Sequence, residues 1–203
     1  FYIFNLSYKK IQINMNFKTK KPTLLLVDVQ KAFLDKDYPG IKRNNPEAEF
    51  VCGKILGIWR KKKFPIIHVR HSSDSVESKL HESNTGFEFN DYVTPKGDEI
   101  VLKKNVNSAF IGTDLKSILD KYNTETLIIV GMTTNHCIST TVRMSGNLGF
   151  ETYLISDSTA CYNTKGINGE IIDCEVIYQA ALASLNEEFA SVINSEELIN
   201  LIE

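Results

Sequence analysis

The sequence predicts an α/β fold with three layers, αβα, around a six-stranded parallel sheet of the Rossmann-like type. Short apolar runs alternate with segments of helical periodicity from end to end, without an internal repeat or a linker. The run Thr23–Val29 is apolar almost throughout, as expected of a strand that is covered on both faces. The 203 residues suit one domain with a full hydrophobic core.

Strands are expected at six runs that are rich in aliphatic and β-branched residues, namely Thr23–Val29, Pro65–Arg70, Glu99–Lys104, Leu127–Val130, Glu151–Ser156 and Phe189–Ile193. Helices are expected at Pro46–Lys63, Thr113–Tyr122, Ile138–Leu148, Glu170–Leu185 and Glu196–Ile202. The inner side of the first helix is expected to carry Phe50, Ile55, Ile58 and Trp59. The segment Ser72–Pro95 is long and polar, and such loops often cover a site.

Charge is distributed unevenly along the chain. The net charge is −2, but residues 1–22 hold five lysines and no acid, which leaves 18 basic and 25 acidic residues, or −7, for the remainder. An acidic body argues against nucleic acid as the main partner. Residues 1–14 are aromatic and basic and are interpreted as an extension of doubtful function, so the working domain is predicted over residues 15–203.

The four cysteines lack the spacing of a metal site or a disulfide framework. A reducing, cytoplasmic setting is the simplest account of them, and neither a metal nor another cofactor is expected. The longest apolar run is far shorter than a membrane span, so no membrane partner is expected.

Three reactive side chains follow different predicted strands. Asp28 and Lys104 stand at the carboxyl ends of their strands, and Cys137 comes shortly after a third. Carboxyl ends of parallel strands meet at one edge of the sheet, where ligands bind. An acid, a base and a thiol on one edge predict a cysteine-dependent hydrolase, whereas each residue alone is also compatible with a solvated strand end or a small buried hydrophobe.

Cys137 has a distinctive local context. Gly131 ends the strand, a polar turn follows, and the thiol is expected in the first turn of the helix over Ile138–Leu148. The unpaired N–H groups of a helix start and the positive end of its dipole favour a thiolate. The nearby Asp28 carboxylate opposes that effect, so the net shift is left open and the two groups are treated as a coupled pair.

Three motifs in order resemble the isochorismatase-like cysteine hydrolase superfamily, which includes nicotinamidases and N-carbamoylsarcosine amidohydrolases. These motifs are LLLVDVQKAF, KNVNSAFIGTDL and VGMTTNHCISTTVRMSGNLGFETYLISDSTA. The resemblance runs from about Pro22 to Ile193 and is specific for the superfamily but not for the substrate. It implies an isochorismatase-type fold, a small-molecule substrate and a homo-oligomer.

The resemblance implies a catalytic Asp28, Lys104 and Cys137, with Lys104 chosen over its neighbour because it stands four residues before Ser108. It also implies a cis peptide between Met132 and Thr133. The N–H groups of Thr133 and Cys137 would then form the oxyanion hole. Candidate pocket walls are Gln30, Phe33, His71 and Phe110.

Two departures from the family pattern limit the functional interpretation. Nicotinamidases of the superfamily commonly bind a metal through histidines between the first two strands, but residues 35–64 contain no histidine. His68 and His71 are three apart and should point to opposite faces of a strand. A metal is therefore not expected, and nicotinamide is a less secure substrate.

Three functions remain open at this point. The leading one is hydrolysis of a small amide through a thioester on Cys137. The second is hydrolysis of an isochorismate-type vinyl ether, which does not need a cysteine. The third is a non-catalytic small-molecule or redox-sensing binding protein, in which Cys161 could serve as a second thiol near the same edge.

Overall fold

The computed structural model describes residues 21–34 and 42–203, so the predicted extension over residues 1–14 lies outside the described part of the chain. The main sheet has six parallel strands in the order β3-β2-β1-β4-β5-β8. These strands are β1 (Thr23–Val27), β2 (Ile66–His71), β3 (Ile100–Lys104), β4 (Thr126–Gly131), β5 (Glu151–Ile155) and β8 (Ser191–Ile193). The prediction of a six-stranded parallel sheet in an αβα fold is confirmed.

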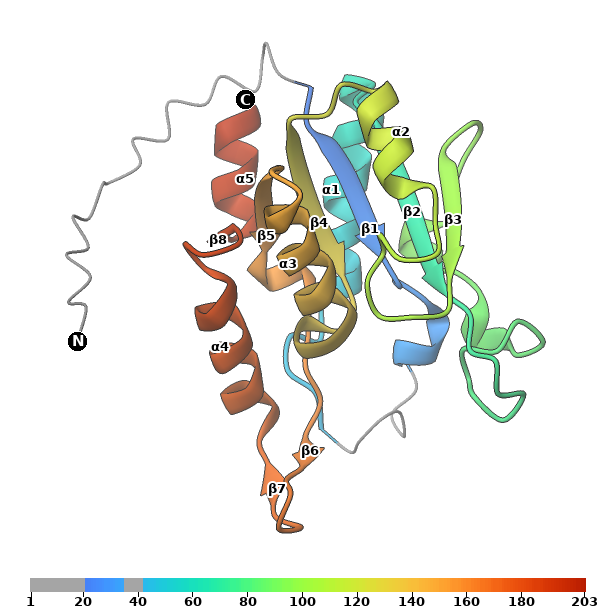
Figure 1. Cartoon of the computed structure of the whole chain (residues 1–203), viewed down its shortest axis with the longest axis vertical. Helices are drawn as coiled ribbons and strands as arrows, with labels where there is room; N and C mark the ends of the chain where they lie inside the picture. Colours follow the sequence, from blue (N-terminus) through green and yellow to red (C-terminus); the bar gives the residue numbers. More distant parts are fainter. Residues whose placement is uncertain (1–20, 35–41) are drawn as a thin grey trace, which may run out of the picture.

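Five α-helices of the described part of the chain cover the two faces of this sheet (Figure 1). On one face lie α1 (Ala48–Lys62) and α5 (Ser195–Ile202), which pack on one set of strand side chains. On the other lie α2 (Leu115–Lys121), α3 (Ser139–Asn147) and α4 (Cys174–Leu185). Within residues 21–34 and 42–203, no helix has the length and apolarity that crossing a bilayer requires.

Strand β1 shows why the central strands are almost uniformly apolar. Leu24 and Leu26 pack against Trp59 and its neighbours on the α1 face, while Leu25 and Val27 pack toward α2 and α3 on the other. All five residues of the strand are buried. Alternate side chains of a strand point to opposite faces, so a strand covered by helices on both sides needs apolar residues at every position.

The predicted inner side of α1 is correct for three of its four residues. Ile55 and Trp59 are fully buried, and Ile58 packs against the same core cluster from a partly buried position. Phe50 is 44% exposed, and its ring instead packs edge-on against Tyr92, with 5.6 Å between the ring centres. The loop over residues 72–95 supplies Tyr92, so a long-range contact, not helical periodicity, decides where Phe50 lies.

The predicted start of the fourth helix at Glu170 is wrong. A small antiparallel hairpin, β6 (Thr164–Lys165) and β7 (Ile171–Ile172), precedes the helix and projects from the body (Figure 1). The helix begins only after Asp173, whose side chain accepts a hydrogen bond from the N–H of Glu175. An aspartate cap of this kind supplies an acceptor for a free N–H group at the helix start.

Candidate active site

Asp28 directly follows β1, and its backbone turns sharply there. Its φ of +55° lies in the left-handed region, which an aspartate tolerates better than most residues. The Asp28 N–H donates to the carbonyl of Val69, at 2.8 Å, and this bond holds the turn against β2. The carboxylate is fully buried at the carboxyl edge of the sheet.

Lys104 is the last residue of β3 and lies beside His71, its register partner on β2. The Lys104 ammonium is buried and makes three polar contacts. Its Nζ atom lies 2.6 Å from Oδ2 of Asp28, 3.4 Å from Sγ of Cys137 and 3.2 Å from Nδ1 of His71. The three side chains that the sequence predicted at one edge therefore meet there. The Lys104 ammonium lies between the Asp28 carboxylate and the Cys137 thiol.

The turn from β4 to Cys137 depends on Gly131. This residue has a φ of +129°, and a Cβ atom added there would lie 1.9 Å from the carbonyl oxygen of Val27. The missing side chain lets the end of β4 approach β1, and the next N–H, of Met132, donates to the same Val27 carbonyl at 2.9 Å. The peptide between Met132 and Thr133 is cis.

Cys137 lies in η4 (Thr134–Ile138), a π-helix of one turn that leads into α3. The sequence predicted the first turn of a regular helix at this place. The 159–161 segment braces this turn. The N–H of Thr134 donates to the carbonyl of Ala160 at 3.0 Å, and the Thr134 hydroxyl bonds that of Thr159 at 2.9 Å. π-helical turns are rare and are frequently found at functional sites.

Burial dominates the acid–base properties of the site. It raises the pKa of the Cys137 thiol to about 12; the negative charge of Asp28 acts in the same direction, and Lys104 opposes both. Burial also raises the pKa of the Asp28 carboxyl, against the opposing charge of Lys104. The net shift, which the sequence left open, is therefore upward, because burial and the Asp28 charge outweigh Lys104. With its pKa raised to about 12, the thiol is protonated at neutral pH.

Asp28 lies close to the Cys137 thiol. A carboxylate oxygen of Asp28, a ring nitrogen of His71 and the sulfur of Cys137 all lie within 4.8 Å of one another. The second carboxylate oxygen of Asp28, Oδ1, is buried and makes no hydrogen bond within the described residues. A buried acceptor without a partner is costly, so it readily takes a nearby proton.

The same three side chains offer the donor set of a small metal site, but they do not fit one as placed. Their ligand atoms converge on the ammonium of Lys104, which already bonds to Asp28, Cys137 and His71. A divalent cation would have to displace this buried positive charge. His68 lies apart from the group, since its Nε2 atom bonds the carboxylate of Glu99 at 2.9 Å.

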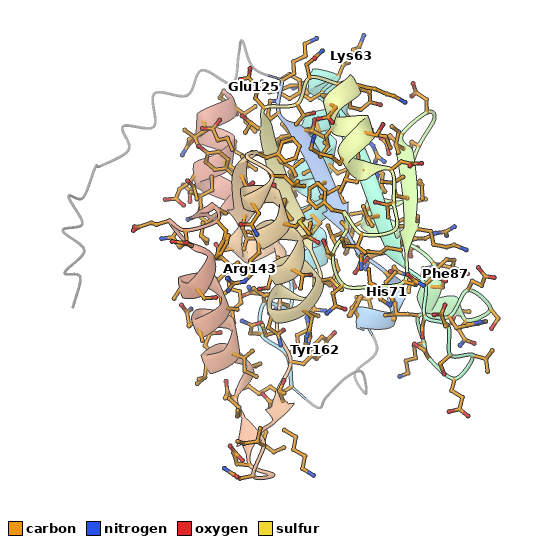
Figure 2. The ribbon with its side chains drawn as sticks, viewed as in Figure 1. Lys63, His71, Phe87, Glu125, Arg143 and Tyr162 are labelled. Carbon is orange, nitrogen blue, oxygen red and sulfur yellow. The ribbon has the colours of Figure 1, made fainter. Side chains whose placement is uncertain are left out.

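The four candidate pocket residues have different environments. His71 is the last residue of β2 and lies at the carboxyl edge of the sheet (Figure 2). Phe33 is buried in a separate cluster with Met132 and Tyr162. Phe33 also contributes its backbone carbonyl, which accepts a hydrogen bond from the Tyr162 hydroxyl at 2.6 Å.

Gln30 and Phe110 make contacts that the sequence does not display. Gln30 is fully buried, and its amide bonds only backbone groups of His71 and Phe87 among the described residues, so it braces the site rather than lining it. The ring of Phe110 stacks on Phe150, with 6.1 Å between ring centres. Phe150 precedes the amino end of β5, so this contact holds Phe110 away from the carboxyl edge.

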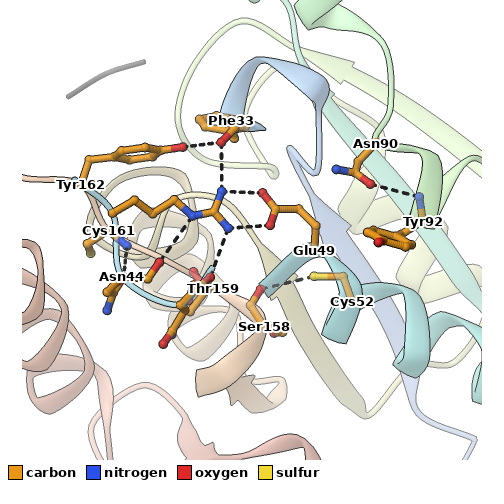
Figure 3. A network of polar contacts seen from close by, with 12 residues as sticks. Phe33, Asn44, Glu49, Cys52, Asn90, Tyr92, Ser158, Thr159, Cys161 and Tyr162 are labelled. Atoms are coloured by element: carbon orange, nitrogen blue, oxygen red, sulfur yellow. Dashed lines mark hydrogen bonds and ion pairs between the residues drawn. The ribbon is translucent and has the colours of Figure 1, made fainter. Parts of the chain in front are cut away.

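Sequence reasoning missed a network of polar contacts between the loop before α1 and the segment over residues 159–161 (Figure 3). The guanidinium of Arg43 bonds both carboxylate oxygens of Glu49 and the carbonyl of Phe33. The next residue, Asn44, accepts from the N–H of Cys161 at 2.8 Å. The segment over residues 159–161, which hydrogen-bonds to η4, is therefore itself hydrogen-bonded to the loop before α1. Only the run of polar residues Arg43-Asn44-Asn45 signals this in the sequence.

Residues 22–197 match the isochorismatase domain. The uncharacterized isochorismatase family protein YrdC of Bacillus subtilis is 45% identical over 181 residues, which cover 89% of this chain and 96% of YrdC. Nicotinamidase 3 of Arabidopsis thaliana is 26% identical over 193 residues, which cover 89% of this chain and 88% of that protein.

A solved structure shows the same architecture. An isochorismatase-family protein from Chromobacterium violaceum superposes with a TM-score of 0.87 at 34% identity, over 92% of this chain and 96% of the other. The shared sheet order, the domain match over nearly the whole described chain and this degree of identity lead to one conclusion. The chain belongs to the isochorismatase family of hydrolases.

Proposed function

We propose that this protein hydrolyses the C–N bond of a small-molecule amide through a thioester on Cys137. The observation that carries the proposal is the Lys104 ammonium, which lies between the Asp28 carboxylate at 2.6 Å and the Cys137 sulfur at 3.4 Å. A nucleophile, a base and a fixed positive charge in contact are the parts that covalent acyl transfer requires. The name of the relative nicotinamidase 3 supports an amide as the substrate class.

The first step is transfer of the thiol proton to Asp28 as the sulfur attacks the amide carbon. Because the pKa of Cys137 is raised to about 12, a free thiolate is scarce at neutral pH. The raised pKa of Asp28 makes that carboxylate a stronger base than an ordinary aspartate. Deprotonation and attack are therefore expected to occur together, with the new negative charge developing on the substrate oxygen.

That oxygen needs donors as its charge grows. The turn over residues 131–137 is held against β1 and against Ala160, so the backbone N–H groups of Thr133 and Cys137 are proposed as the oxyanion hole. Lys104 adds a full positive charge within contact of the sulfur. Donors fixed before the reaction stabilise the transition state without reorganisation.

Collapse of the tetrahedral intermediate breaks the C–N bond. Asp28 returns its proton to the leaving nitrogen, which departs as ammonia or an amine, and the acyl group stays on Cys137. Water then attacks the thioester and passes a proton to Asp28. The carboxylic acid is released as the sulfur takes that proton back, so the enzyme returns to its starting state.

Ammonia release from a panel of small amides tests the proposal. The panel contains primary carboxamides and N-carbamoyl compounds, and brief reaction followed by intact-protein mass spectrometry seeks the acyl mass on Cys137. Amide hydrolysis that requires Cys137 supports the thioester route. Cleavage of a vinyl ether by Cys137→Ala at the wild-type rate would support the ether-hydrolase alternative. Ligand binding without any turnover would support the binding-protein alternative.

A further inference from the structure

His71 and Lys104 face the same side of the sheet for a structural reason. They are register partners at the ends of the neighbouring parallel strands β2 and β3. Paired residues of adjacent strands present their side chains to the same face. Nδ1 of His71 consequently lies 3.2 Å from Nζ of Lys104, within hydrogen-bond distance.

The Lys104 ammonium has three N–H bonds and three acceptors. Oδ2 of Asp28, Sγ of Cys137 and Nδ1 of His71 account for all of them. A lysine ammonium can only donate, so Nδ1 of His71 must carry a lone pair and the ring proton must be on Nε2. Since the Lys104 side chain is completely buried, an N–H without an acceptor would be costly.

The surroundings of His71 favour its neutral form. Burial lowers the pKa of His71, and the positive charge of Lys104 lowers it further; the carboxylates of Asp28 and Asp74 act in the opposite direction. Cys137 also faces the ring, within 4.8 Å, and is protonated at rest. The ring can therefore serve as an acceptor at neutral pH.

Gln30 holds the backbone of His71 in place. The Gln30 amide oxygen accepts from the His71 N–H at 2.8 Å, and its NH2 group donates to the His71 carbonyl at 3.0 Å. Gln30 is fully buried and also donates to the carbonyl of Phe87. These two hydrogen bonds from one amide fix the His71 backbone from which the ring reaches Lys104.

We propose that His71 is a positioning residue: as a neutral acceptor it takes the third N–H of Lys104 and keeps the ammonium centred between Asp28 and Cys137. The use of that centred charge in catalysis rests on the proposed function, whereas the hydrogen bond itself does not. Without the acceptor, the buried ammonium turns toward other acceptors. That movement takes its positive charge away from the Cys137 sulfur.

Two substitutions of His71 separate this role from packing. In His71→Asn the amide oxygen takes the place of Nδ1 and stays an acceptor, while His71→Leu keeps the bulk and removes the acceptor. Alkylation of Cys137 by iodoacetamide at pH 8 reports the thiolate without any substrate. We expect His71→Asn to react within about twofold of the wild type and His71→Leu about tenfold more slowly, equivalent to about one pKa unit of the thiol.

The matched control is His81→Asn, which alters a partly buried histidine of the following loop that bonds Ser83. It should alkylate at the wild-type rate, and thermal unfolding should show that all variants remain folded. Equal alkylation rates in His71→Asn and His71→Leu would overturn the proposal, whether both match the wild type or both fall.

Nuclear magnetic resonance of the wild-type protein gives a test without substituting His71. Long-range proton–nitrogen spectra should show His71 with its proton on Nε2. In Lys104→Met the His71 pKa should rise, because the neighbouring positive charge is gone. A proton on Nδ1 in the wild type, or no change of the His71 pKa in Lys104→Met, would contradict the inference.

Steady-state kinetics distinguish this inference from the proposed function. On any amide that the wild type hydrolyses, His71→Leu should lower kcat with little change in KM, and His71→Asn should largely restore it. If no amide is hydrolysed but the alkylation and resonance results are as expected, the proposed function fails and the role of His71 stands. If amides are hydrolysed and His71→Leu retains full kcat, the role of His71 fails alone.

Discussion

Replacing Asp28 by Asn should change hydrolysis and thiol alkylation in opposite directions. The substitution removes the general base and proton donor, so amide hydrolysis should fall by about 10³ or more. It also removes a negative charge that raises the pKa of Cys137. Lys104 contacts both Asp28 and Cys137. Once the carboxylate is replaced, the Cys137 sulfur is the one group among the three contacts of Lys104 that can carry a balancing negative charge. The thiolate should therefore become more abundant, not less.

The structure sets the scale of the second effect. With a pKa of about 12, the thiol is ionised to roughly one part in 10⁴ at pH 8. Each unit by which that pKa falls raises the thiolate population about tenfold. We expect Asp28→Asn to alkylate with iodoacetamide about tenfold faster than the wild type at pH 8, or more.

The assay compares alkylation, followed by peptide mass spectrometry at Cys137, with ammonia release on one amide substrate. Asp98→Asn changes an exposed aspartate and serves as the matched control, with both rates unchanged. Slower alkylation in a folded Asp28→Asn protein would show that the Asp28 charge does not suppress the thiolate. Hydrolysis near the wild-type rate would show that Asp28 is not the base.

Four further predictions concern the same molecule. Cys137→Ala should lose about 10³ or more in turnover, and its combination with Asp28→Asn should be little worse than the worse single variant, measured as kcat on the same amide. Activity should survive EDTA, because an ammonium occupies the space between the potential metal ligands; loss restored by zinc or iron would contradict this. Gly131→Ala should lower the melting temperature and the turnover together, since its Cβ would overlap the Val27 carbonyl. The pKa of Glu99 is lowered from 4.5 to about 2, because the hydrogen bonds from Arg60 and its neighbours outweigh the opposing effect of burial. The ionised Glu99 carboxylate therefore stabilises the fold above pH 4.5, and this stabilisation is lost as the pH falls toward 2. Glu99→Gln should flatten that part of an acid-unfolding curve.

The sequence by itself determined the fold class and pointed to Asp28, Lys104 and Cys137 as candidate reactive groups. Continuous apolar runs such as Thr23–Val27 require cover on both faces, and their alternation with helical segments permits few arrangements other than a parallel sheet between helices. Because carboxyl ends of parallel strands share an edge, Asp28 and Lys104 could be placed together with the turn before Cys137 without coordinates. These inferences depend on local periodicity, which a sequence displays directly.

Tertiary structure alone decided how these groups act on one another. The β2–β3 register places His71 beside Lys104, and register depends on which strands become neighbours, a long-range outcome. Burial of the site makes the Cys137 thiol a weak acid, although its position near a helix start suggested the reverse. The contacts of Phe50 with Tyr92 and of Phe110 with Phe150 likewise join distant segments. The pKa of a group, its burial and its contacts all depend on which residues surround it in space. They therefore follow from the folded arrangement and not from any one stretch of sequence.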